Sequence, residues 1–247
     1  MYLRACKYQQ SCAMAHANDL HDALVDPATG ALKSGKRILF LYADGGPDWS
    51  TKSAKTLYYM GKLWEKVGLD CLSIGSGGAG LSAYNTIERD WAGLSKRLTG
   101  VCLSDTLRGA AKPPCATPGL TGAERTDAEH RVFDGAMRKV CRYWDGKTVN
   151  GGINHVKVVP CAAVPFPFND LEAFNLYTKI PPTYSGKKVE TKLKQLGVPD
   201  ADVAAVAEKV LEIRCAMRYF TRHVDRRCTF LQLTKCADMN CTRCQKT

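Results

Sequence analysis

The sequence predicts an α/β fold, and three successive stretches of the chain support that prediction. An apolar run at residues 37–43 has the length of a buried strand, and Gly45, Gly46 and Pro47 stop it. A helical pattern follows over residues 49–68, and a second apolar run begins at Leu69 and ends at Ile74. Strand, helix and strand at this spacing form a βαβ unit, so we expect two parallel strands that are adjacent or nearly so.

The first strand of this unit is expected to be buried on both faces, because its apolar run is unbroken. Ser50 or Thr51 is expected to cap the helix after it, and Gly68 to end that helix. Upstream of the unit, residues 11–26 carry apolar side chains at a spacing of three and four, which is typical of a helix. The core is therefore expected to hold a βαβ unit with flanking helices.

The second strand leads into a glycine-rich loop at residues 75–80 and then a predicted helix at about residues 83–98. Prolines and glycines predict a loop or linker at residues 104–125 and an extended segment at 150–169. Helical patterns recur in three further stretches, at residues 126–143, 187–196 and 199–220. Residues 228–233 alternate as a short strand does.

These elements predict a chain in three parts. Residues 1–103 are expected to form the α/β core, and residues 104–125 to link it to a C-terminal region. Residues 126–247 are expected to form that region, which is mostly helical and has a cysteine-rich tail. The end of the tail, at about residues 223–244, is a candidate zinc site.

Composition indicates a basic globular protein. The chain has 247 residues, 45% of them hydrophobic, and a formal net charge of +11. Such a charge favours contact with DNA or another polyanion. Twelve cysteines lack the regular spacing of a secreted disulfide scaffold, and we see neither a signal peptide nor a membrane-spanning run. We therefore expect an intracellular, nuclear protein, without a membrane partner; a homodimer is one assembly that the sequence leaves open.

Asp44 and Glu88 are candidate ligands of a divalent metal. Asp44 stands where the first strand stops, and Glu88 stands at the start of a later helix. Two carboxylates that meet at the carboxyl edge of a sheet can hold Mg²⁺ or Mn²⁺, which activates a water or a hydroxyl. Taken singly, such residues also occur as a turn residue and as a partner of the helix dipole, so spacing alone leaves both interpretations open.

The residues around these acids resemble a known family. The stretch from Ile38 to Asp48 is similar to the strand that carries the second acid of DDE-type, mariner-like transposases, and the stretch from Ser82 to Leu98 is similar to the signature of the third acid. The resemblance implies a partial RNase H-like, integrase-like core that uses Mg²⁺ to cut and join DNA, with Asp44 and Glu88 as catalytic residues. It covers residues 37–103 well and residues 220–244 loosely.

The chain departs from that family in ways that weaken the predicted chemistry. Thr86 stands where the family has a proline, and the first catalytic acid should lie on a strand well upstream of Asp44. Only a predicted helix and a loop occupy that region. We therefore expect a truncated or degenerate transposase-derived DNA-binding protein that is inactive or weakly active. The alternative is a basic interaction module with a zinc-binding tail, in which the two acids are relics.

The C-terminal cysteines predict a zinc site. Cys241 and Cys244 have the CxxC spacing of a zinc half-site, and Cys236 supplies a third thiol. His223 or Cys228 could complete a tetrahedral set. Pairs of this kind also arise by chance in a cysteine-rich chain, so an inert tail is the open alternative.

A run of arginines near residue 220 is a candidate DNA-binding surface. Arg218, Arg222 and Arg226 recur at about helical spacing, together with Arg214 and Arg227. They could follow a phosphate backbone, or they could form an ordinary solvated helix face. The glycine-rich loop, by contrast, lacks the GK[ST] ending of a phosphate-binding loop, which argues against a nucleotide site.

Overall fold

The structure is a computed structural model of the whole chain. It describes residues 1–5, 7–27, 30–77, 86–107, 110–149, 151–162 and 166–236, and the side chains of residues 31 and 86–90 are not described. The fold is mixed α/β with a small mixed sheet. The chain forms two compact units that interleave in sequence: the first unit is Met1–Ser11 with Gly80–Pro165, and the second is Cys12–Ala79 with Phe166–Thr247.

A four-stranded sheet is the centre of the second unit. Its order is β2 (Ile38–Ala43), β3 (Cys71–Ser76), β8 (Phe230–Thr234) and β7 (Val224–Arg227). Strands β2 and β3 are parallel, with Ile38 opposite Cys71, whereas β8 runs antiparallel to both of its neighbours. The predicted parallel and adjacent pair is thus confirmed, and an RNase H-like core stays a prediction.

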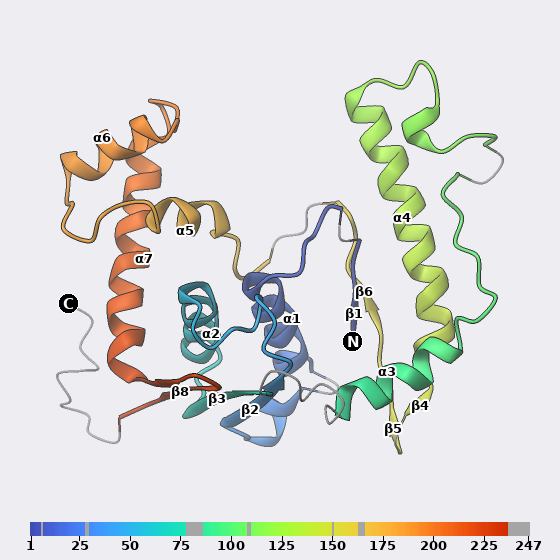
Figure 1. The fold of residues 1–247 in the computed structure, drawn as a ribbon, viewed down its shortest axis with the longest axis horizontal. Helices are drawn as coiled ribbons and strands as arrows, with labels where there is room; N and C mark the ends of the chain where they lie inside the picture. Colours follow the sequence, from blue (N-terminus) through green and yellow to red (C-terminus); the bar gives the residue numbers. More distant parts are fainter. Residues whose placement is uncertain are drawn as a thin grey trace. The chain divides into compact units, whose positions relative to one another are not determined.

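Three helices pack on one face of this sheet. They are α1 (Ala13–Val25), α2 (Ala54–Lys66) and α7 (Val203–His223), which Figure 1 shows beside the strands. The aromatic side chains of this core come mainly from α2 and α7, including Tyr59, Trp64 and Phe220, each at most 1% exposed. On the sheet they meet leucine and isoleucine side chains that are fully buried, namely Leu72, Ile74, Leu231 and Leu233.

The expectation that β2 is buried on both faces is wrong. Leu39 and Leu41 pack against the core, but the alternate residues Ile38, Phe40 and Tyr42 are 73%, 64% and 55% exposed. The reason is topological. Strand β2 is at the edge of the sheet, and helices of its own unit pack on only one of its faces. Only alternate residues of its apolar run are therefore covered by the core.

A smaller helical layer completes the second unit. Helix α5 (Leu171–Tyr177) and helix α6 (Lys187–Gln195) pack against α7. Residues from α6 and α7, including Val189, Leu193 and Val210, form a separate buried cluster. Arg214 is buried there and donates to the carbonyl oxygens of Tyr184 and Pro181, so it holds the turn before α6.

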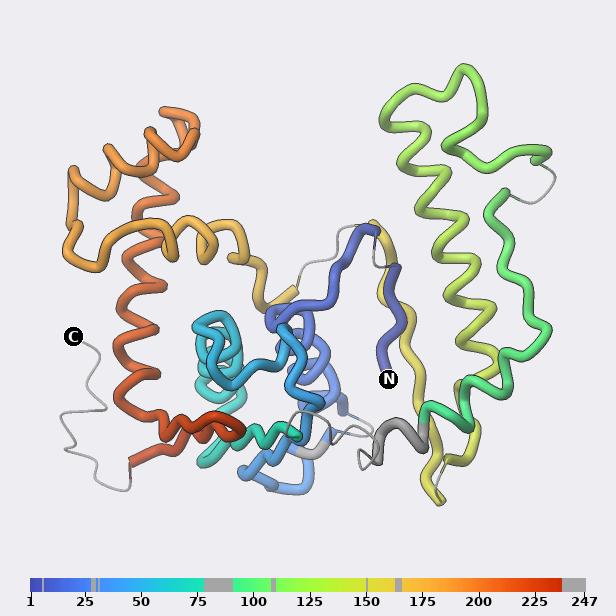
Figure 2. Tube along the Cα trace, viewed as in Figure 1, coloured from blue at the N-terminus to red at the C-terminus, as the bar shows by residue number. Residues whose placement is uncertain are grey.

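The first unit is organised along one long helix, α4 (Gly122–Trp144). Beside it lie the parallel pair β1 (Tyr2–Leu3) and β6 (Lys157–Val158), the hairpin β4 (Thr148–Val149) and β5 (Gly152–Ile153), and helix α3 (Thr86–Lys96). The segment after α3 carries the short 3₁₀ helix η3 (Pro114–Ala116) and runs alongside α4, as Figure 2 shows. Residues 104–125, the expected linker, therefore lie within this unit.

Several element boundaries differ from the expected ones. Helix α2 begins at Ala54, because Ser53 is its N-cap and accepts from the amides of Lys55 and Thr56; the expected caps, Ser50 and Thr51, lie in the turn before it. Helix α7 runs on to His223 and passes directly into β7, which the sequence did not predict. Among the described helices, none is both long and apolar enough to span a bilayer.

Candidate nucleic-acid interface

Helix α4 starts from a well-formed N-terminus. The carboxylate of Glu124 accepts from the backbone N–H of Thr121 at 3.2 Å and from its hydroxyl at 2.8 Å. These contacts hold the pKa of Glu124 below its usual value. A carboxylate in the first turn also complements the partial positive charge of the helix N-terminus. The whole helix, Gly122–Trp144, has 23 residues.

One side of α4 is fixed to the rest of its unit. The indole N–H of Trp144 donates to the carbonyl of Leu94 at 2.9 Å. The carboxylate of Asp134 accepts from the amide of Cys161 at 2.9 Å, and Met137 is buried in a small cluster with Cys161. Burial, helped by Asp134, raises the pKa of the Cys161 thiol to about 12, so this cysteine is an unreactive packing residue.

A stripe of arginines follows another side of α4. Arg131, Arg138 and Arg142 are exposed, and their spacing of seven and four residues places them on one face of the helix. Gly135 lies between them on that face, where an added Cβ would meet nothing within 4 Å. No ion pair forms with these three guanidinium groups within the part of the chain that the structure describes. We call this set the α4 arginine stripe.

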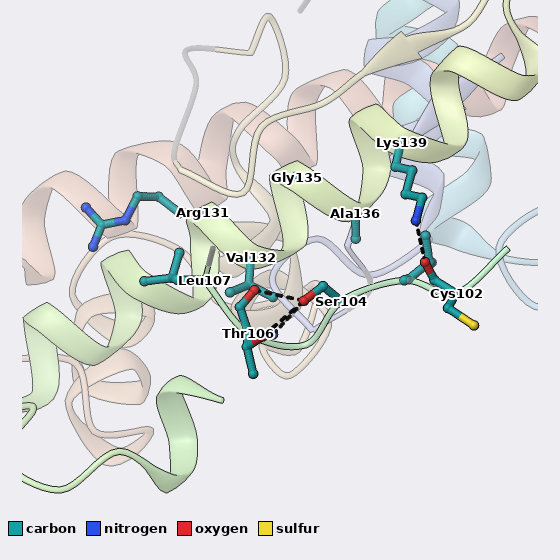
Figure 3. A pocket seen from close by; sticks show the side chains of 10 residues that line it. Cys102, Ser104, Thr106, Leu107, Arg131, Val132, Gly135, Ala136 and Lys139 are labelled. Carbon is teal, nitrogen blue, oxygen red and sulfur yellow. Dashed lines mark hydrogen bonds between the residues drawn. The ribbon is translucent and has the colours of Figure 1, made fainter. Parts of the chain in front are cut away.

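A pocket of about 350 Å³ adjoins the stripe. Arg131 and Lys139 lie at its two ends, and Ser104 and Thr106 line the side formed by the segment that follows α3 (Figure 3). Lys139 donates to the carbonyl of Cys102 at 2.6 Å, and the Ser104 hydroxyl lies 3.1 Å from that of Thr106. The pocket therefore combines cationic and hydroxyl groups with apolar side chains such as Leu107 and Val132.

A second pocket of about 410 Å³ shares part of its lining with the first, including Ser104 and Val132. Its lining is mostly apolar and includes Leu103, Pro114 and Phe133. At its rim Glu129 accepts from both Lys7 and Tyr8, and these two donors hold the pKa of Glu129 below its usual value. Because this half-buried carboxylate is already neutralised, the polar groups of the pocket serve to join the N-terminal segment to α4.

The two predicted catalytic acids lie in different units. Asp44 follows β2 in the second unit, is exposed, and accepts from the amide of Gly46 at 2.9 Å, as a turn residue does. Glu88 lies in α3 of the first unit, and its side chain is outside the described residues. Within the described residues no three His, Cys, Asp or Glu side chains are grouped as metal ligands. The described residues thus do not assemble a magnesium site, and we derive no catalytic step from them.

The predicted zinc ligands are described only in part. Cys241 and Cys244 lie outside the described residues. His223 is buried between Trp64 and Tyr219, and its Nδ1 lies 2.8 Å from the Tyr219 carbonyl oxygen, so zinc ligation by this ring would use Nε2. Cys236 follows β8, whereas Cys228 is at the turn between β7 and β8.

The predicted DNA-binding arginines do not share one helix face. Arg218 and Arg222 lie on α7, but Arg226 lies on β7, where it donates to the carbonyl of Thr51 and where burial lowers the pKa of its guanidinium. The helical spacing predicted from the sequence is wrong at this point, because the helix ends at His223. Of the three, Arg218 is the exposed one.

The α4 arginine stripe was not among the predicted site residues. Its signal was present in the sequence, as arginines seven and four residues apart inside a strong helical pattern. The apolar residues of that stretch predict the helix, whereas its exposed arginines carry the candidate interface.

Comparison with known proteins adds no identification. No protein-family model, no curated protein and no solved structure matches this chain.

Proposed function

We propose that the protein binds nucleic acid through the α4 arginine stripe. The observation that carries the proposal is the set of three exposed arginines on one helix face, with no ion pair to neutralise them among the described residues. From Arg131 to Arg142 the helix rises about 16 Å, and a duplex strand places one phosphate per about 3.4 Å of its axis. The stripe therefore spans several consecutive phosphates.

The surroundings of the stripe support the same ligand. Gly135 leaves room for a backbone to approach α4 closely, since an added Cβ there would meet nothing within 4 Å. The adjoining pocket offers the hydroxyls of Ser104 and Thr106 and the ammonium of Lys139. Groups of these kinds contact phosphates and sugars without reading base sequence, so we expect binding with little sequence preference. A formal net charge of +11 adds long-range attraction.

Titration of a fluorescent DNA duplex and a matched single strand, across a salt series, tests this proposal. Replacing Arg131, Arg138 and Arg142 together by alanine should weaken binding strongly and reduce the slope of log K against log salt by about 2 to 3, because about 0.9 counterions are released per phosphate neutralised. The control replaces three exposed lysines of the second unit, Lys187, Lys188 and Lys194, and so removes the same charge. An equal loss in both variants would show that only net charge matters.

A second candidate is Mg²⁺-dependent DNA strand cleavage by a DDE-type core. One observation favours it: β2 and β3 are parallel and adjacent, and Asp44 is exposed at the carboxyl end of β2, where ligands of α/β sheets gather. The test is nicking of supercoiled DNA with Mg²⁺ or Mn²⁺, with Asp44→Ala and Glu88→Ala as the paired variants. Activity that survives both substitutions would exclude these acids from the reaction. Binding without any nicking would leave the interaction module as the function.

A further inference from the structure

We propose that strand β2 pairs with β2 of a second copy of this chain, so that two sheets join at their edges into one. Strand β2 is at the edge of its sheet, and its exposed side chains are large and apolar. An edge of this kind, without an inward charge, a proline or a bulge, is a template for another strand. The nucleic-acid proposal uses the other unit, so the two proposals stand or fall separately.

The backbone of β2 determines which residues would pair. The carbonyl of Arg37 accepts from Asp70 and Cys71, and the carbonyl of Ala43 accepts from Gly77. Odd-numbered residues therefore direct their backbone groups toward β3, and the even-numbered residues Ile38, Phe40 and Tyr42 direct theirs toward the open edge. An added strand must bond to these three residues.

Only some registers of an antiparallel pair meet that condition. Even-numbered residues must face even-numbered residues, because otherwise the outward N–H and C=O groups would not meet. The symmetric register sets Phe40 opposite the second copy's Phe40 and Ile38 opposite its Tyr42. Each of these pairs would exchange two backbone hydrogen bonds, and their side chains would form one apolar row across the twofold axis.

Charge selects the same register. A basic residue, Lys36, precedes β2, and an acidic residue, Asp44, follows it, and both are exposed. With Phe40 on the axis, Lys36 of one copy lies opposite Asp44 of the other, at both ends of the paired strands. A shift by two residues would instead place Asp44 opposite Ile38, or Lys36 opposite Tyr42, and would lose both charge pairs. The strand is thus complementary to itself in hydrogen bonds, apolar side chains and charge.

The same face of the sheet is mixed away from this edge, where β8 also places Phe230 opposite Gly75. Opposite Phe40, β3 has Ser73, and beyond it β8 has Gln232, which accepts from the Ser73 hydroxyl at 3.0 Å. Among the described residues, the exposed large apolar side chains of this face all lie on the edge strand. Edge pairing gives each of them a new neighbour.

Sedimentation velocity of the full chain over a wide concentration range tests the proposal. We expect a monomer–dimer equilibrium, and Phe40→Lys should raise its dissociation constant at least about tenfold, because a lysine on the axis faces its own copy. The control is Ile153→Lys on β5, since Ile153 is also 64% exposed and is not part of this edge. It should leave the dimer intact.

Two further variants test the register. Lys36→Glu should weaken the dimer, and the charge exchange Lys36→Glu with Asp44→Lys should restore it. In Phe40→Cys, oxidation should give a disulfide between the two copies of residue 40, identified by mass spectrometry, whereas Ile38→Cys should give far less of the 38–38 link.

Three outcomes would overturn the proposal. The first is a chain that stays monomeric at every concentration. This outcome includes a monomer in which another part of the same chain protects the β2 amides from hydrogen exchange. The second is a dimer that Phe40→Lys leaves unchanged. The third is a dimer with no 40–40 link and no response to the charge exchange.

Discussion

At the scale of single residues, Asp170 is a mostly buried carboxylate of the second unit that contacts two side chains of α2. Its carboxylate lies 2.5 Å from the hydroxyl of Tyr58 and 2.8 Å from the ammonium of Lys62, both on α2, so it joins the start of α5 to that helix. Burial opposes the ionisation of Asp170, but these two donors outweigh it and lower its pKa. The charge is therefore stabilised where it lies.

Asp170→Asn should lower the free energy of unfolding by about 2–3 kcal/mol at neutral pH, the usual cost of losing charge-assisted hydrogen bonds. Because the folded pKa lies below the unfolded value, the carboxylate stabilises the fold above about pH 4 and loses that effect as the pH falls through the folded pKa. Denaturant unfolding from pH 7 to pH 2 should thus show the difference between wild type and variant shrinking in acid.

Asp200→Asn is the matched control, because Asp200 pairs with Lys194 but is 82% exposed. It should leave unfolding unchanged, since exposed ion pairs contribute little. A difference between wild type and Asp170→Asn that stays constant down to pH 2 would contradict the proposed role of the charge.

At the scale of elements, the contact between α2 and α7 depends on the absence of one side chain. Gly61 on α2 faces Phe220 on α7, and a Cβ added to Gly61 would lie 2.5 Å from that ring. Phe220 is fully buried, so it has no free space into which to move. A glycine in the middle of a helix costs stability, and the fit against Phe220 explains why one occurs here.

Gly61→Ala should therefore destabilise the protein by about 1–3 kcal/mol through overpacking, although alanine favours helix formation. Gly135→Ala on α4 is the opposite case, because it meets open space and should stabilise the protein by about 0.5–1 kcal/mol. Thermal unfolding of both variants checks the contrast. Stabilisation by both substitutions would mean that α2 and α7 are not packed as described.

The same scale shows what the sequence could predict. The runs that became β2 and β3 are apolar and end at glycines, so their existence and parallel pairing followed from pattern alone. The exposure of Phe40 did not follow, because an unbroken apolar run gives no period from which to identify an open face. The placement of β8 beside β3 joins residues about 160 positions apart, which local pattern cannot encode.

Site prediction had similar limits. The spacing that suggested an arginine face around Arg222 continued past the real end of α7, because no glycine or proline marks His223 as its last residue. The arginines of α4 had the right spacing within one helix, and only their exposure distinguished them. The prediction that Asp44 lies at a strand end is correct, but which side chains lie near it depends on the tertiary structure.

At the scale of the whole molecule, the sequence gathers Cys236, Cys241 and Cys244 near its end and spreads the other cysteines along the chain. Free thiols are spread through the described residues of both units, from Cys12 to Cys228. The hairpin of β7 and β8 determines which described candidate zinc ligands lie at the same end of the sheet. Val224 pairs with Leu233, so His223 and Cys236 lie at the same end of the hairpin, while Cys228 is at its turn. Of the two candidate fourth ligands, the hairpin favours His223, since β7 separates Cys228 from that end.

We therefore expect about one zinc ion per chain, bound by Cys236, Cys241, Cys244 and His223, a donor set that suits a tetrahedral structural site. Metal analysis of protein purified without chelator should find it, and Cys236→Ser should lose it. Cys215→Ser is the control, because Cys215 is an exposed thiol on α7 that is not grouped with other metal-ligating side chains within the described residues. If zinc is bound, its removal should also lower the thermal stability of the chain, because a metal that binds only the folded state stabilises it. Retention of zinc by Cys236→Ser would show that Cys236 is not a ligand, and loss of zinc from Cys228→Ser would show that Cys228, not His223, is the fourth ligand.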